Sequence, residues 1–157
     1  MMKDPLALAL KKLANKVYSF REMQQILTSC GYDQEEITNV LQRLVSWGYL
    51  NDEKLAESIY SYHVNYKPCG RSLLLRKMLY KGIPTDIAAS VLNHLDEETE
   101  LSLAHKLTNK YTANKKGFTR RQLAVKTAHY LKTKGFSTKT IRRIIENLDV
   151  FEDQFFD

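Results

Sequence analysis

A short block of sequence occurs three times in this chain, and it constrains the fold more than any other feature. The copies read CGYDQEEITNVLQRL (Cys30–Leu44), KGIPTDIAASVLNHL (Lys81–Leu95) and KGFSTKTIRRIIENL (Lys134–Leu148). In each copy a Gly precedes a large apolar residue, and apolar residues recur 6, 9, 10 and 13 positions after that Gly. This spacing forms one face of an α-helix, and Gly suits the left-handed turn that ends the helix before it.

The repeated block predicts a tandem array of helical modules with a period of about fifty residues. No segment shows the alternation of a strand. We therefore predict an all-α, elongated array of three three-helix, helix-turn-helix-like repeats. The repeats are expected at residues 1–50, 51–97 and 98–148, followed by an acidic, aromatic tail at 149–157.

Local signals mark where the nine expected helices begin and end. Capping boxes start at Ser19, Asp33 and Thr119, where a Glu or Gln follows three residues later. The Pro68-Cys69-Gly70 breaker is expected to end the fourth helix, which begins near Asp52. The last helix is expected to run to about Leu148.

Charge is distributed unevenly along the chain. The net charge is +6, but residues 99–148 hold twelve Lys and Arg against two acids, and no acid lies between Glu100 and Glu146. Residues 149–157 carry four acids and no basic group. A stretch of one sign favours a polyanion or an acidic protein face as a partner.

Basic residues around the expected start of the eighth helix are the first candidate site. Cations there oppose the helix dipole, so helix stability does not explain them. Contact with an anion would explain these cations. The candidates are Lys115, Lys116, Arg120, Arg121 and Lys126.

The outer face of the last helix is the second candidate. Lys139, Arg142 and Arg143 occupy it, while the apolar residues of the block take the inner face. Such a stripe suits a phosphate backbone, although a solvated helix face is the alternative. Arg71, Arg76 and Lys77 form a third, similar set near the fifth helix, with the same alternative.

Aromatic residues of the fourth helix have two interpretations. Tyr62 and Tyr66 extend a stripe with Leu55 and Ile59, which favours core packing, but aromatic rings beside cations can also stack single-stranded bases. Trp47 is expected in the core between modules.

The sequence has little that indicates an enzyme. The four His share no ligand spacing with Cys or acids, and no phosphate-binding or nucleophile motif occurs. We expect no catalytic residue, no metal and no cofactor. Two Cys without ligand spacing and the lack of a signal peptide or a membrane-length apolar run favour a cytoplasmic protein without membrane contact.

The stretch LVSWGYLNDEKLAESIYSYHVNYKPCGRSLLLRKMLYKGI (Leu44–Ile83) resembles the RecX family of bacterial recombination regulators. The family pattern is a Gly-Tyr-Leu-x-Asp turn, an aromatic and Ala-containing helix, a Gly loop and a helix that ends in Lys-Gly-Ile. Leu55, His63, Asn65, Arg71 and Lys77 depart from the family's usual residues. The resemblance extends to chain size and to the three-repeat organisation.

The resemblance implies a curved array that binds the RecA filament on DNA. From the groove of the RecA filament the protein would inhibit the ATPase and strand exchange of RecA or promote disassembly of the filament. This role would belong to DNA repair and the SOS response. We expect a monomer that contacts single- and double-stranded DNA through charge, with little sequence preference.

Two alternatives stay open. A helix-turn-helix transcription factor would read bases with the helix at 138–148, but this helix is rich in Lys and Arg and has few base-reading side chains. A purely structural helical adaptor would not need the basic third module.

Overall fold

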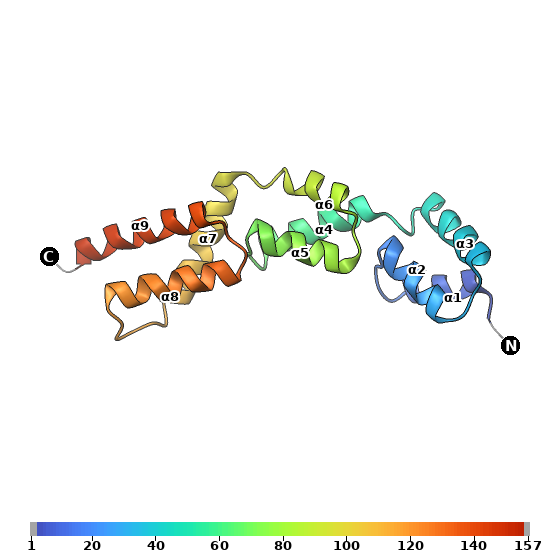
Figure 1. Ribbon diagram of the computed structural model, residues 1–157, viewed down its shortest axis with the longest axis horizontal. Coiled ribbons are helices and arrows are strands. Elements are labelled where there is room, and N and C mark those ends of the chain that lie inside the picture. Colours follow the sequence, from blue (N-terminus) through green and yellow to red (C-terminus); the bar gives the residue numbers. More distant parts are fainter. Residues whose placement is uncertain (1–2, 156–157) are drawn as a thin grey trace. The chain divides into compact units, whose positions relative to one another are not determined.

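The structure is a computed structural model that describes the backbone of residues 3–155 and the side chains of residues 3–148. Within this range the chain forms nine helices and no strand, which confirms the all-α prediction (Figure 1). The helices are α1 (Pro5–Leu13), α2 (Phe20–Ser29), α3 (Gln34–Ser46), α4 (Asp52–Asn65), α5 (Arg71–Lys81), α6 (Thr85–Leu92), α7 (Glu97–Thr112), α8 (Arg120–Thr133) and α9 (Thr138–Phe155).

Helix starts follow the local capping signals. The Oγ or Oδ atoms of Ser19, Asp33 and Thr119 each accept a bond from the backbone N–H three residues on, and the side chain at that position bonds back. Asp96 caps α7 by accepting from the N–H of Thr99 at 2.7 Å. These bonds satisfy donors that the first helical turn leaves without partners.

The glycines of the repeated block adopt the predicted left-handed turn. Gly31, Gly82 and Gly135 have φ values of +89°, +98° and +89°. The apolar residues 6, 9, 10 and 13 positions after each Gly are buried in the first two copies. At these positions of the third copy Ile144 is buried, at 1% exposure, while Ile141, Ile145 and Leu148 are half-buried.

The chain divides into two compact units. One contains the residues up to Ile59 together with Met78–Val91, and the other contains Tyr60–Lys77 together with the residues from Leu92 onward. The predicted second repeat, 51–97, contributes to both units. The three-repeat boundaries remain a prediction.

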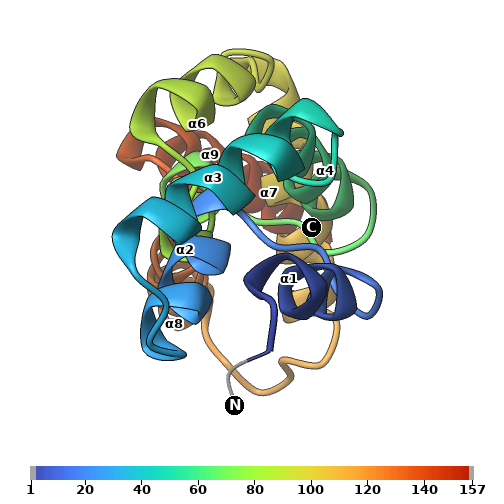
Figure 2. The same cartoon turned by 90° about the vertical axis from the view of Figure 1, so that its right-hand side faces the viewer.

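The first unit has its core between α1, α2 and α3, which are labelled in Figure 2. Ser19 is fully buried at the start of α2, where its Oγ donates a 2.6 Å hydrogen bond to the carbonyl of Lys81. The buried core residues are Ala9, Met23, Leu27, Ile37, Val40, Leu41, Leu44 and Leu50.

The second unit is built on α7, α8 and α9. Each of these helices packs on the other two, and Figure 1 shows α8 and α9 as neighbours joined by the Gly135 turn. Tyr60 and Val64 of α4 pack against the same core. The buried members of this core are Leu95, Leu103, Ala104, Leu107, Leu131, Phe136 and Ile144.

Three sequence-based expectations about side chains and ends were wrong. Tyr62 and Tyr66 are 51% and 79% exposed, because α4 turns Tyr60, His63 and Val64 inward instead. Trp47 is 50% exposed, since it caps the end of α3, where its ring lies 5.0 Å from the guanidinium of Arg43. The last helix continues past Leu148 to Phe155, and the side chains of the predicted tail at 149–157 lie outside the described residues.

Candidate nucleic-acid interface

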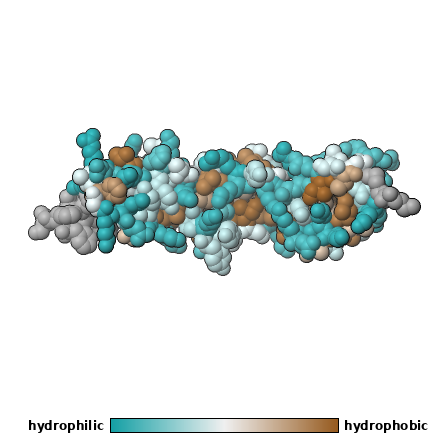
Figure 3. All heavy atoms as spheres, turned by 90° about the horizontal axis from the view of Figure 1, so that it is seen from below, coloured by the Kyte–Doolittle hydropathy of each residue, from teal (hydrophilic) through white to brown (hydrophobic). Residues whose placement is uncertain are grey.

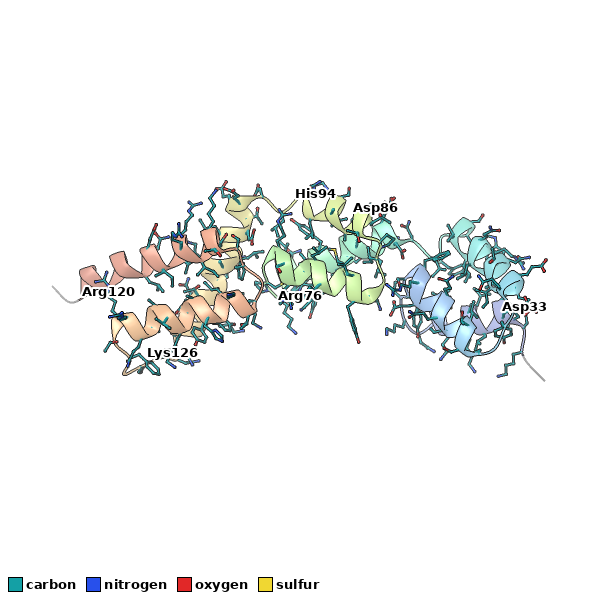
Figure 4. All side chains as sticks on the ribbon, viewed as in Figure 1. Asp33, Arg76, Asp86, His94, Arg120 and Lys126 are labelled. Atoms are coloured by element: carbon teal, nitrogen blue, oxygen red, sulfur yellow. The ribbon has the colours of Figure 1, made fainter. Side chains whose placement is uncertain are left out.

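All eleven basic residues predicted from the sequence belong to the second unit. Arg71, Lys77 and Lys115 are half-buried, and the other eight are exposed. Figure 4 shows Arg120 and Lys126 on α8 and Arg76 on α5. The predicted residues do not form one patch but divide among separate places in the unit.

The start of α8 carries the first group. Thr119 caps the helix, and its first turn contains Arg120 and Arg121 but no acid. The ammonium of Lys126 lies 4.8 Å from the centre of the Phe118 ring, which is 42% exposed. Figure 3 shows that the surface seen from below is mostly hydrophilic, with separate apolar patches. This end of α8 therefore presents positive charge next to an exposed aromatic ring.

A second group lines a cleft of about 650 Å³ near the starts of α5 and α9. Arg71, Lys139 and Arg143 line it together with the carboxylates of Glu97 and Glu100. The Lys139 ammonium lies 2.9 Å from Glu97, and its hydrogen bond and charge lower the pKa of that carboxyl. Arg71 donates to the carbonyl of Leu95. This cleft is mixed in sign, which weakens its attraction for a polyanion.

A third place, a groove between α7, α8 and the turn after α4, was not predicted as a site. Its volume is about 520 Å³, and it contains no carboxylate among its lining residues. Three tyrosines, Tyr66, Tyr111 and Tyr130, line it. Five lysines surround them: Lys67, Lys106, Lys110, Lys115 and Lys134. We call this the Lys–Tyr groove.

Of the residues that line the Lys–Tyr groove, Lys115 alone is among the eleven basic candidates predicted from the sequence. Lys106 and Lys110 lie four residues apart on α7, so they share a helix face, and this spacing was the signal available in the sequence. Lys67 and Lys134 join them only through tertiary packing.

Buried His63 lies in the same unit at 7% exposure. Its Nδ1 lies 2.9 Å from the carbonyl oxygen of Lys67. Burial lowers the pKa of the imidazole, and the charge of Lys77 adds to the effect, while the bond to Lys67 opposes it. His63 is therefore a neutral structural residue near neutral pH.

Neither a metal cluster nor a membrane span is found in the part of the chain that the structure describes. No three His, Cys, Asp or Glu residues come together there as metal ligands. None of its helices is long and apolar enough to cross a bilayer. Both cysteines, Cys30 and Cys69, are free thiols.

Comparison with known proteins supports one family, although no family model matches the chain. Regulatory protein RecX of Clostridioides difficile is 28% identical over 92% of this chain. Regulatory protein RecX of Streptococcus gordonii is 32% identical over 94% of it. The crystal structure of RecX from Lactobacillus salivarius superposes with a TM-score of 0.84 at 25% identity, covering 93% of this chain and 95% of that one. These similarities support the RecX family for this chain.

These similarities to RecX proteins agree with the resemblance inferred from Leu44–Ile83. The chain spans 68% of the length of the C. difficile relative and 56% of that of the S. gordonii relative. The names of both RecX relatives describe regulatory proteins, and a RecX-type regulatory role is what these similarities support.

Proposed function

We propose that this chain binds the RecA recombinase filament on DNA and inhibits its ATPase and strand-exchange activities. The protein would act as a cytoplasmic monomer, without a cofactor or a catalytic group. Similarity to RecX proteins supports a regulatory role, and the charge of the second unit supports a partner that contains nucleic acid.

The observation that carries the proposal is the acid-free run of the second unit. Twelve Lys and Arg lie at residues 99–148 against Glu100 and Glu146, and Glu100 is buried at 7% exposure. A surface of this kind attracts phosphates without reading bases, because the charge of a phosphate backbone does not depend on sequence. The binding residues that we propose are Lys115, Lys116, Arg120, Arg121, Lys126, Lys139, Arg142, Arg143, Arg71, Arg76 and Lys77.

The alternative of a helix-turn-helix transcription factor has one supporting feature, which is the α8–turn–α9 arrangement closed by Gly135 at φ +89°. A recognition helix needs side chains that pair with base edges. Lys and Arg can pair with guanine, but residues 138–148 have no Gln and only Asn147 near their end to pair with adenine, and Lys139 already bonds to Glu97 at 2.9 Å. Phosphate contact is the better match for these residues.

The deciding experiment measures the ATPase of RecA on single-stranded DNA during titration with this protein. We expect inhibition at amounts well below one molecule per RecA, and the same inhibition when the protein is added to preformed filaments. Inhibition only before filament assembly would indicate competition for DNA. No inhibition at any ratio, together with a defined footprint on duplex DNA, would replace the proposal with the transcription factor.

A further inference from the structure

The Lys–Tyr groove concentrates more unopposed positive charge than the cleft near the start of α9 does. Five lysines line it without a carboxylate, whereas three cations and two carboxylates line the cleft near the start of α9. Lys67, Lys106 and Lys110 are exposed. Placing like charges together weakens the folded state through repulsion, so packing does not account for the arrangement. A polyanionic ligand in the groove would remove that repulsion.

Two tyrosines of the groove, Tyr111 and Tyr130, form a flat aromatic surface that we call the floor of the groove. The rings of Tyr111 and Tyr130 stack with centroids 4.2 Å apart and planes 8° apart. The Lys115 ammonium lies 4.7 Å from the Tyr111 ring centre, and the Lys134 ammonium lies 5.6 Å from that of Tyr130. These cation–π contacts hold two of the lysines beside the floor.

The third tyrosine leaves its ring open to a ligand. Tyr66 is 79% exposed at the end of α4, next to Lys67 and Pro68. Its ring lies near that of Tyr62, with centroids 6.0 Å apart and planes tilted by 41°. An exposed aromatic ring among lysines is a surface on which a nucleic-acid base can stack.

We propose that the Lys–Tyr groove binds single-stranded DNA, with phosphates on its lysines and an unpaired base on Tyr66. This inference rests on the proposed function only for the choice of DNA as the ligand. A duplex keeps its base faces inside the helical stack, so it can use the lysines but not the ring. An acidic protein segment would likewise use the lysines alone. The ring therefore gives the groove its preference for single strands.

The test is a binding titration of the full chain with a fluorescein-labelled oligo-dT of about 16 nucleotides. The variants are Tyr66→Ala, Tyr66→Phe, and the triple change Lys67→Gln, Lys106→Gln and Lys110→Gln. A matched control removes three exposed lysines of the first unit, by Lys11→Gln, Lys12→Gln and Lys54→Gln. A second probe, an abasic strand of the same length, keeps the phosphates and lacks the bases.

We expect Tyr66→Ala to weaken oligo-dT binding between about 5-fold and about 150-fold, which is the range for loss of one stacked base. Tyr66→Phe should bind as the wild type does, since it keeps the ring. The abasic strand should bind the wild type and Tyr66→Ala equally. The groove triple should reduce the slope of log affinity against log salt by about 2, at about 0.7 for each phosphate contact, and by more than the control triple does.

Two results would overturn the inference. One is unchanged oligo-dT binding by Tyr66→Ala, and the other is equal losses in the groove and control triples. If the groove variants bind oligo-dT normally but lose binding to RecA, the groove is a protein site instead. Failure of the wild type to inhibit RecA, with groove-dependent DNA binding intact, would remove the proposed function and leave this inference standing.

Discussion

Gly70 and Gly135 meet backbone to backbone in the second unit, with no space for a side chain on either residue. The N–H of Gly70 donates a 2.8 Å hydrogen bond to the carbonyl of Lys134, and the N–H of Ser72 donates one of 3.1 Å to the carbonyl of Gly135. A Cβ on Gly70 would lie 2.4 Å from the carbonyl carbon of Gly135. A Cβ on Gly135 would lie 2.4 Å from the backbone nitrogen of Leu73. The turn before α9 is therefore joined to the start of α5.

The first unit has a similar junction. Its Gly82 turn lies against the start of α2, where a Cβ on Gly82 would lie 2.7 Å from the Oγ of Ser19. Lys81 adds an ion pair with Glu22 at 3.1 Å. In both units, the turn that opens one copy of the repeated block contacts the start of a helix distant in sequence.

Substitution of Gly70 or Gly135 by Ala should destabilise the fold. We expect Gly70→Ala to lower the free energy of unfolding by about 1–3 kcal/mol, because the backbones must move apart. Gly135→Ala should cost about 1–2 kcal/mol more, since its φ of +89° also becomes strained. Gly117→Ala is the control, because it shares the positive φ, at +83°, but has no atom within 4 Å of a new Cβ. Urea titrations followed by circular dichroism measure all three, and equal losses for Gly117→Ala and Gly135→Ala would contradict the packing argument.

Ser19→Ala should remove both a helix cap and a junction bond. The buried Oγ accepts from the N–H of Glu22 at 3.1 Å and donates to the carbonyl of Lys81 at 2.6 Å. We expect a loss of about 1–2 kcal/mol in thermal or urea unfolding. Thr28→Ala, which removes an exposed hydroxyl bonded to the carbonyl of Gln24, should change stability by less than about 0.5 kcal/mol. A Ser19→Ala loss no larger than this would show that the junction bond is not stabilising.

His63 should make stability fall as the pH drops below 6.5. Burial lowers the pKa of the folded imidazole, whereas the unfolded chain takes up its proton near pH 6.5. Between the lowered value and pH 6.5 the unfolded state binds more protons, so stability rises with pH in that window. His63→Gln should remove this dependence, and the exposed His129→Gln should not. Urea midpoints measured across the window test the prediction, which fails if His63→Gln and wild type keep the same pH slope.

Charge reversal at the start of α8 tests the candidate residues of the proposed function. Arg121→Glu with Lys126→Glu should weaken binding to duplex DNA of any sequence. If each side chain contacts one phosphate, the slope of log affinity against log salt should fall by about 1.8, at about 0.9 for each contact. Lys11→Glu with Lys12→Glu makes the same change in net charge on the first unit. An equal effect of the two pairs would mean that net charge alone, rather than this end of α8, drives binding.

Helix boundaries could be predicted from the sequence because their causes are local. Ser19, Asp33 and Thr119 each bond to a backbone group three residues away, so the residues that make the cap are neighbours in the chain. The left-handed turns at Gly31, Gly82 and Gly135 follow from the residue type in the same way.

Which residues of α4 face the core could not be predicted from the sequence. Leu55, Ile59, Tyr62 and Tyr66 satisfy a helical stripe, but so do Ala56, Tyr60, His63 and Val64. Both stripes have helical spacing and both begin at a buried residue, Leu55 or Ala56, so the packing partner decides which residues are buried in the second half of α4. In the structure Tyr60 and Val64 meet the core of the second unit, so Tyr66 is left exposed.

Local patterns in the sequence suffice to predict that the chain is helical, where its helices start, where its turns need glycine, and that its positive charge gathers in residues 99–148. Tertiary packing, in contrast, brings Gly70 against Gly135, pairs Glu97 with Lys139, and joins Tyr66 and Lys67 to lysines of α7 and α8 in one groove. The two kinds of feature differ in the range of the interactions that produce them. Capping and backbone preference act over three or four residues, whereas a groove depends on packing between segments dozens of residues apart, which no local pattern encodes.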